Sequence, residues 1–348
     1  MNVEEFLSRH GSLIEREVKG RLTELLESAK AYHPLIGELY SKLGEFILRG
    51  GKRLASCSTI LTYIGYGNRV DERIVKASAG IEFYRHSILV HDDLVDRDPE
   101  RRRGETIHVT FAKKRNGRFG EGVAIFAGNI LYALATRSLL GSGFRQELAN
   151  EAVSLLAEAY KEVNESQILD LFFEAEEPKV DEWYAMASRR AASLFKAAIL
   201  IGATLGEAPR EDLKILREAA LNIGYSFDIQ DDIIDLFASK EEYGRSPGRD
   251  LCLGKKPLHM VYALSMAGGD RVREIKACFG KRKLSPRGLD RVRGIVKRSG
   301  ALDAAKSKSR AHAEEAKKLL DRTKLSQEAK SIFASLISYV EESLEWYK

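Results

Sequence analysis

"IVKASAGIEFYRHSILVHDDLVD", residues 74–96, is apolar on almost every side until it reaches its three closing aspartates. A helix with so little polar surface is usually enclosed by other helices. Residues 122–140, "GVAIFAGNILYALATRSLL", and residues 191–206, "AASLFKAAILIGATLG", have the same character. Residues 220–237, "ALNIGYSFDIQDDIIDLF", again form an apolar stretch that ends in acids. Together these stretches predict an all-α bundle.

The remaining chain is also periodic at helical spacing. Residues 3–29 and 39–48 are expected to form opening helices, and residues 299–348 are expected to form amphipathic outer helices. Only seven prolines interrupt 348 residues, and no alternating strand pattern, repeat or low-complexity linker is present. We therefore predict a single all-helical domain over residues 1–348.

Composition limits the kind of protein. Apolar residues make up 44% and charged residues 31%, as in soluble globular proteins. The net charge of +5 needs only a few anion sites and predicts no nucleic-acid partner. Three widely spaced cysteines indicate a reducing compartment. The charged N-terminus is no signal peptide, and no run of about 18 apolar residues predicts a transmembrane segment, so we expect a cytoplasmic protein.

Two acidic clusters carry the first sign of chemistry. Residues four apart share one face of a helix, where like charges repel and burial increases the cost. Carboxylates grouped in this way suit Mg²⁺, which bridges them to phosphate. A solvated acidic helix end is the alternative for either cluster alone. The metal ligands predicted are Asp92, Asp93, Asp96, Asp231, Asp232 and Asp235, with Asp228 an uncertain member one turn before the second cluster.

Cations accompany both clusters. Arg102 and Arg103 follow the first; Arg245, Arg249 and Lys255 follow the second; and "RGGKRL" supplies Lys52 and Arg53 beside two glycines. A diphosphate requires this combination, because Mg²⁺ binds some of its oxygens and Arg or Lys binds the rest. The glycine pair followed by lysine is a weak signal by itself and is not a P-loop.

The chain resembles the trans-isoprenyl diphosphate synthases over the stretch from "GGKRL" through both acidic motifs to "GKK". The resemblance implies a helical bundle around a deep central cavity, a homodimer, and about three Mg²⁺ on the six aspartates. It also implies isopentenyl diphosphate and allylic prenyl diphosphates as substrates. The residues implied for the allylic diphosphate are Arg102, Arg190, Gln167, Arg245 and Lys255. Those assigned to isopentenyl diphosphate are Lys52, Arg53, Arg85, His86 and Arg103.

The implied reaction needs no protein nucleophile, since the allylic diphosphate ionises and the isopentenyl double bond attacks the cation. His91 is either a base or, more simply, a packed histidine. Side chains before the first acidic motif set the product length in that family. Here Ser87 and Ile88 leave room, and Tyr84 lies one turn further, which predicts a product of about C20 to C25 with Tyr84 as its floor. Ordinary core packing is the alternative for Tyr84.

The chain departs from the family pattern at several positions. Ala55 replaces an arginine that contacts isopentenyl diphosphate, Arg190-Ala191 replaces Lys-Thr, Asp228 replaces a glutamine, Arg245 replaces a lysine, and Asn129 replaces an aspartate. Arg85 stands in an apolar helix about two turns before Asp92. We therefore predict that Arg85 supplies the charge that Ala55 lacks. A buried ion pair with Glu82 is the alternative.

Two other functions fit parts of the pattern. A non-catalytic subunit of a heteromeric prenyl synthase should lose aspartates from its motifs, whereas all six are present. A class I terpene cyclase shares the first motif, but "DDIIDLFASKEE" does not match its second. A prenyltransferase is the function predicted.

Overall fold

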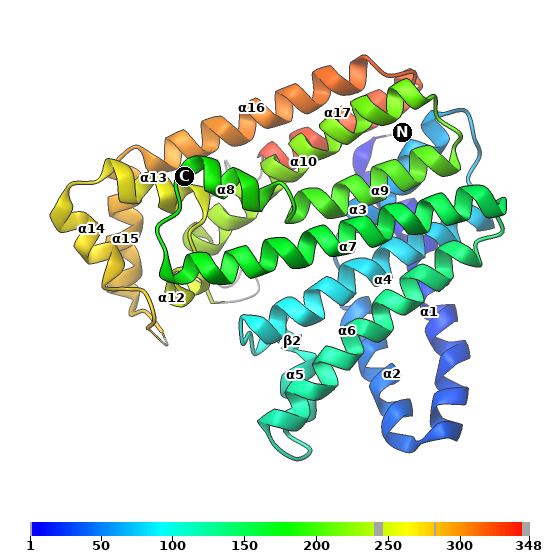
Figure 1. Cartoon of the computed structure of the whole chain (residues 1–348), viewed down its shortest axis with the longest axis horizontal. Coiled ribbons are helices and arrows are strands. Elements are labelled where there is room, and N and C mark those ends of the chain that lie inside the picture. Colours follow the sequence, from blue (N-terminus) through cyan, green and yellow to red (C-terminus); the bar gives the residue numbers. More distant parts are fainter. Residues whose placement is uncertain (1, 240–245, 282, 343–348) are drawn as a thin grey trace. The chain divides into compact units, whose positions relative to one another are not determined.

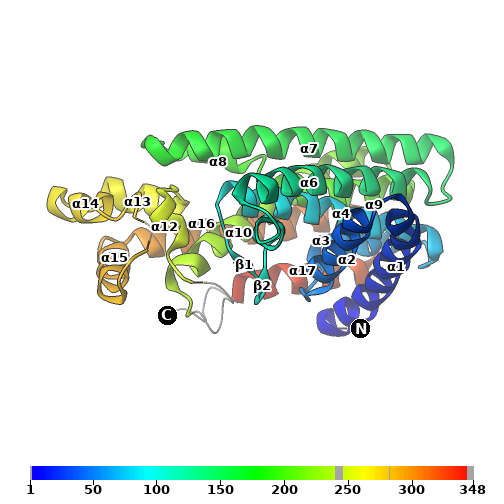
Figure 2. The ribbon, with the colours of Figure 1, turned by 90° about the horizontal axis from the view of Figure 1, so that it is seen from below.

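The computed structural model describes residues 2–239, 246–281 and 283–342 and is almost entirely helical (Figures 1 and 2). The prediction of an all-α protein is confirmed. The elements in chain order are α1 (Val3–Tyr32), α2 (Pro34–Leu48), α3 (Leu54–Gly65), α4 (Glu72–Val95), β1 (Glu100–Arg101), β2 (Gly104–Glu105), α5 (Ile107–Ala112), α6 (Gly117–Leu140), α7 (Gln146–Ala175), α8 (Val180–Ala187), α9 (Ala191–Leu205), α10 (Arg210–Phe237), α12 (Arg249–Leu253), α13 (Leu258–Met266), α14 (Gly269–Lys276), α15 (Pro286–Arg298), α16 (Ala301–Asp321) and α17 (Gln327–Glu342).

The described chain divides into two compact units. Unit 1 comprises Met1–Leu156, Ala197–Pro209 and Ser326–Ile332, and unit 2 comprises Ala157–Lys196, Arg210–Leu325 and Phe333–Lys348. Each unit holds one of the two acidic motifs. The expectation of a single domain over the whole chain stays a prediction.

Helix α4 is the buried helix of unit 1, as its composition predicts. It begins at Asp71, whose carboxylate accepts hydrogen bonds from the backbone N–H groups of Arg73 and Ile74. Its residues from Ile74 to Val90 are mostly buried, and it packs against α1, α3 and α6. Gly80 allows the close approach to α6, since a Cβ at Gly80 would lie 3.1 Å from the carbonyl oxygen of Ala135.

Helix α6 bears on the expectation that the chain has no transmembrane segment, which stays a prediction. Over its 24 residues it is long and apolar enough, by length and composition alone, to cross a membrane. Such helices also occur in the cores of soluble proteins, and α6 packs on both α4 and α5.

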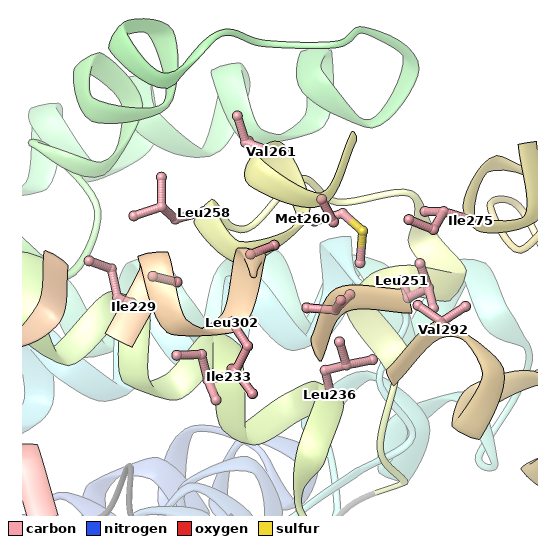
Figure 3. Packing of buried hydrophobic residues seen from close by; sticks show 14 of the residues in the cluster. Ile229, Ile233, Leu236, Leu251, Leu258, Met260, Val261, Ile275, Val292 and Leu302 are labelled. Carbon is pink, nitrogen blue, oxygen red and sulfur yellow. The ribbon is translucent and has the colours of Figure 1, made fainter. Parts of the chain in front are cut away.

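Unit 2 is built around α10. Ile229, Ile233 and Leu236 of α10 join a cluster of buried apolar side chains from α12, α13, α14, α15 and α16 (Figure 3). Burial of such side chains stabilises a fold by about 1.5–3 kcal/mol each relative to exposure. The apolar stripe of α10 therefore holds the helix that carries the second acidic motif.

A short hairpin follows the first acidic motif, although the sequence showed no strand pattern. β1 and β2 are antiparallel, with Arg101 opposite Gly104. The two residues of the turn, Arg102 and Arg103, have φ of 51° and 60°. Tight hairpin turns with positive φ usually contain Asn or Gly, so two arginines give no sequence signal for one. Left-handed backbone at non-glycine residues costs about 1–2 kcal/mol each and is often found at functional sites.

Candidate active site

The first acidic motif closes α4 and is held by one arginine. Arg101 Nη2 lies 3.0 Å from Asp92 Oδ2, and Arg101 Nε lies 2.5 Å from Asp93 Oδ1. Asp96 is the C-terminal cap of α4, and its side chain is buried. The hairpin therefore places the Arg101 side chain against Asp92 and Asp93, which precede it in the sequence.

Asp93 has a buried carboxylate oxygen that suits a metal ion. It is 1% exposed, and its Oδ2 is buried without a hydrogen-bond partner among the described residues. Burial raises the pKa of Asp93 to about 7, although Arg101 opposes the shift. A carboxylate oxygen left in this state fits a divalent cation. No three acidic, histidine or cysteine side chains converge on one point in the parts of the chain that the structure describes.

A cluster of cations surrounds the glycine loop of residues 50–52. The Arg102 guanidinium donates to the carbonyl oxygen of Gly50, and a Cβ at Gly51 would lie only 2.7 Å from it. Gly51 has φ of 121°, which only glycine adopts readily. Burial lowers the pKa of Arg102 to about 9, and the nearby charge of Arg85 adds to the shift. This concentration of positive charge favours a strongly anionic ligand.

Arg53 and Glu82 form a buried ion pair beneath that cluster. The side chains of Arg53 and Glu82 are 2% and 1% exposed. Arg53 also donates to Glu15 and to the carbonyl oxygen of Ile47, while Ser56 donates to Glu82 at 2.7 Å. Each guanidinium nitrogen of Arg53 thus has a protein partner. This arrangement fits a support for the loop better than the ligand contact predicted for Arg53.

Arg85 and His86 flank Glu82 on α4. Arg85 Nη1 lies 3.8 Å from Glu82 Oε1, and the Arg85 side chain is 25% exposed. The ion pair with Glu82 that was the alternative for Arg85 is thus present, but the contact is long and Arg53 is the closer partner. His86 is fully buried, and burial lowers its pKa to about 3, so the ring is neutral at physiological pH.

The hairpin directs its three arginines to different places. Arg101 contacts the acids, Arg102 contacts the glycine loop, and Arg103 is exposed at the turn. The contacts of Arg102 with the allylic diphosphate and of Arg103 with isopentenyl diphosphate stay predictions. Side chains alternate between the two faces of a strand, so adjacent arginines of a tight hairpin diverge. Arg101 was absent from the predicted site, and the run of three arginines offered no sign of the register.

The second acidic motif is also held by an arginine. Arg190 Nε lies 2.9 Å from Asp228 Oδ2, and its Nη2 lies 2.8 Å from Asp232 Oδ2. Burial alone would lower the pKa of Arg190, but Asp228 and Asp232 outweigh it and hold that pKa well above its usual value. Burial raises the pKa of Asp228 to about 6, against the effect of Arg190. Two departures from the family pattern, Arg190 and Asp228, thus pair with each other.

Asp170 on α7 completes this network, and the sequence analysis did not single it out. Its oxygens lie 3.8 Å from Arg190 Nη1 and 3.1 Å from Lys255 Nζ. Gln167, one turn earlier on α7, is half-buried. "ESQILD" offered a weak signal, because Gln167 and Asp170 are three residues apart on one helical face.

The other members of the second motif differ in exposure. Asp231 is exposed, whereas Asp235 is 2% exposed and its Oδ2 accepts from the backbone N–H of Asp250 at 3.2 Å. The predicted contact Arg245 lies outside the described residues.

Helix α4 also holds the residues proposed to set product length. Tyr84 and Ser87 are fully buried, and Ser87 donates to the carbonyl oxygen of Tyr84 at 2.8 Å. Ile88 is half-buried. His91 packs against Gly128, where a Cβ would lie 2.1 Å from its ring, and its Nε2 lies 3.1 Å from the carbonyl oxygen of Ile125. These contacts favour the packed histidine over the base.

Comparison with known proteins gives a consistent result. The family model for polyprenyl synthetase matches residues 37–296. A short chain isoprenyl diphosphate synthase of Methanocaldococcus jannaschii is 30% identical over 281 residues, which cover 81% of this chain and 83% of the relative. A geranylfarnesyl diphosphate synthase of Aeropyrum pernix is 33% identical over 305 residues, covering 86% and 92%. A solved geranylgeranyl pyrophosphate synthase of Corynebacterium glutamicum, complexed with isoprenyl diphosphate and magnesium, shares the fold. It has a TM-score of 0.87 and 22% identity and covers 99% of this chain and 100% of that one.

Proposed function

The chain belongs to the polyprenyl synthetase family, and we propose that it condenses isopentenyl diphosphate head-to-tail with an allylic prenyl diphosphate. The product proposed is a trans-polyprenyl diphosphate of about C20 to C25. The lower chain length, C20, agrees with the name of the geranylgeranyl pyrophosphate synthase of Corynebacterium, and the upper, C25, with that of the geranylfarnesyl diphosphate synthase of Aeropyrum. The proposal depends on one observation: each of two buried helices ends in aspartates, and an arginine side chain contacts them in both.

We assign isopentenyl diphosphate to the cationic cluster of unit 1. Lys52 and Arg102 lie at the glycine loop, and Arg85 lies beside Glu82. Guanidinium groups bind diphosphate oxygens in pairs, and a lysine adds a point charge. The low pKa of Arg102 reflects repulsion and burial that an anion would relieve. Three other predicted ligands of isopentenyl diphosphate stay proposals, although no contact like that of Arg102 supports them: Arg53, His86 and Arg103.

For the allylic diphosphate and its Mg²⁺ we propose two sets of ligands, one in each unit. In unit 1 they are the aspartates of the first acidic motif with Arg101, and in unit 2 those of the second motif with Arg190 and Lys255. The carboxylates fit Mg²⁺, among them Asp93 Oδ2, which has no hydrogen-bond partner among the described residues, and about three ions are proposed. Bound Mg²⁺ supplies Lewis acidity to the leaving diphosphate. Arg101 and Arg190, which contact these carboxylates, would also be available to phosphate oxygens.

The protein's own part in the reaction is to bind, orient and exclude water. Arginines and lysine stabilise the negative charge that develops on the leaving diphosphate. Apolar side chains of α4 shield the allylic cation from water, and the isopentenyl double bond attacks it. The proton that is lost passes to the departed diphosphate, so no serine, cysteine or histidine nucleophile is required. Tyr84 and Ser87, both buried on α4, are proposed to limit the length of the chain.

A homodimer is proposed for the assembly. Apolar side chains are exposed on one helix of each unit, Ile125 and Phe126 on α6 in unit 1, and Ile168, Leu171 and Phe172 on α7 in unit 2. Exposed apolar groups of this size commonly mark protein interfaces. Sedimentation of the wild type and of Phe126→Asp tests the idea, since the variant should sediment as a monomer. We also propose a cytoplasmic location.

A single assay tests the function. The protein is incubated with Mg²⁺, isopentenyl diphosphate and an allylic diphosphate of one, two or three isoprene units, and product length is measured. We expect products of about four to five isoprene units. Absence of product from every primer, with the protein shown to be folded, would overturn the proposal.

A further inference from the structure

The positive charge of the chain is concentrated in one segment. Residues 269–298 contain eleven lysines and arginines against three acidic residues, a net charge of +8. The whole chain carries +5, so the other residues together carry −3. The segment comprises α14, α15 and the connection between them, all within unit 2 (Figures 1 and 2). It holds none of the residues assigned to the two diphosphates.

Packing directs this charge outward. The apolar side of α15, with Leu289, Val292, Ile295 and Val296, is buried in the core cluster of unit 2 (Figure 3). Its remaining surface is therefore polar and cationic. Such a face can adsorb to an anionic surface but has no apolar side chains left to insert into one.

Several of these cations have no acidic partner. Arg273, Lys276, Arg291 and Arg293 form ion pairs, with Asp270, Glu177, Glu274 and Asp290 respectively. Arg271, Lys281, Lys283, Arg287 and Arg298 are exposed, and in the described ranges they make no ion pair. Unpaired like charges on one face repel each other, so a diffuse anionic partner lowers the energy of the folded protein.

A hollow adjoins the same face. It has a volume of about 1130 Å³, and Lys281, Lys283 and Arg293 line it together with Leu284 and Leu289. Asp290 also lines the hollow, so three of these lysines and arginines stand against one acid, and cations of this kind can bind a phosphate group.

From this face, defined as the exposed surface of residues 269–281 and 283–298, we infer that the protein docks on an anionic lipid bilayer. Clusters of four to eight basic residues are typical of proteins that bind acidic lipids. The segment contains one aromatic residue, Phe279, and no tyrosine or tryptophan, so it lacks the stacking platforms that single-stranded nucleic acids favour.

Docking on a bilayer also suits the proposed function, and only the argument from the product, given next, rests on that function. A product with a C20 to C25 hydrocarbon tail is poorly soluble in water but partitions into a bilayer. The enzyme that consumes it is then expected to act at the bilayer. Docking by charge alone keeps the synthase releasable and sensitive to salt.

The test uses full-length protein and vesicles of phosphatidylglycerol and phosphatidylcholine in equal parts, with phosphatidylcholine vesicles as the neutral reference. Arg271→Glu, Lys283→Glu, Arg287→Glu and Arg298→Glu are combined in a face variant. A matched control reverses four exposed cations elsewhere, Arg9, Lys19, Lys308 and Lys318. Both variants change the net charge from +5 to −3, so only the position of the charge differs.

We expect the wild type and the matched control to bind the anionic vesicles at about 0.1 M ionic strength and to be released by added salt. The face variant should bind at least tenfold more weakly. No binding by the wild type, or equal losses in both variants, would overturn the inference. It would also fall if structured RNA bound through this face while vesicles did not.

Prenyltransferase activity with soluble short primers is measured on the same three proteins. Because none of the substituted residues is assigned to either diphosphate or to Mg²⁺, all three should have the same turnover. A failure of vesicle docking with activity intact would refute only this inference. A protein that docks but makes no prenyl product would refute only the proposed function. Melting temperatures confirm that each variant is folded.

Discussion

Arg85 and Arg53 both contact Glu82, but the structure assigns them different tasks, and one pair of variants separates these. Arg53 is 2% exposed and donates to Glu15 and Glu82. Arg85 is 25% exposed and lies 3.8 Å from the Glu82 carboxylate. Removing Arg85 leaves Glu82 with Arg53 and Ser56, whereas removing Arg53 takes away its closest cation. We expect Arg85→Gln to affect substrate binding and Arg53→Gln to affect folding.

The magnitudes follow from the environment of each charge. A hydrogen bond to a charged group contributes about 1.5–3 kcal/mol. Loss of one from Arg85 to isopentenyl diphosphate should raise its KM about 10- to 150-fold, at about 1.4 kcal/mol per factor of ten. The free energy of unfolding should fall by about 1 kcal/mol or less, as for a partly exposed pair. Breaking the buried pair through Arg53→Gln should cost about 3–5 kcal/mol of stability.

The assay has two parts. Initial rates are measured with each substrate varied at saturating levels of the other, and urea unfolding is measured on the same preparations. Arg85→Gln should change the KM for isopentenyl diphosphate much more than the KM for the allylic substrate. Adding Ala55→Arg to Arg85→Gln should recover part of the loss, because Ala55 stands where the family carries an arginine. If Arg85→Gln destabilises the fold as much as Arg53→Gln and leaves that KM unchanged, the reasoning is wrong.

Four further outcomes are expected. Mg²⁺ and a diphosphate analogue together should raise the melting temperature by more than the sum of their separate shifts, because each completes the site of the other; additive shifts would count against a shared site. Ser87→Phe should shorten the product and Tyr84→Ala should lengthen it, as read by chromatography, and unchanged lengths would place the floor elsewhere. Asp228→Asn should raise about tenfold the Mg²⁺ concentration needed for half-maximal activity and for half-maximal thermal stabilisation. The reason is that, among the described residues, Arg190 then pairs with Asp170 and Asp232 alone. Asp228→Glu should restore both concentrations. Burial opposes ionisation of Glu82, but the charges around it lower its pKa to about 2. The stability that Glu82 contributes is therefore present above its unfolded pKa of about 4.5 and is lost as the pH falls toward 2. Acid unfolding of Glu82→Gln should lack this part of the pH dependence.

The order of helices and the two acidic motifs could be predicted from the sequence. Helical periodicity is a local property, so the buried helix over residues 74–96 appears in the structure as α4, between Glu72 and Val95. Aspartates four residues apart must share a helical face, and this much follows from the rise of the helix alone. The resemblance to the prenyl synthases rested on the same local spacing.

Only the tertiary structure decided which cation serves which acid. Arg101 contacts Asp92 and Asp93, because a tight turn at two residues with positive φ sets the register of the hairpin. Asp170 joins Arg190 from a helix far away in sequence, and Arg53 turns inward to Glu82. The direction of a charged side chain depends on long-range packing and on which opposite charge is buried nearby. Neither is encoded in the spacing of a motif, so the sequence determined the groups available for chemistry while the fold determined their partners.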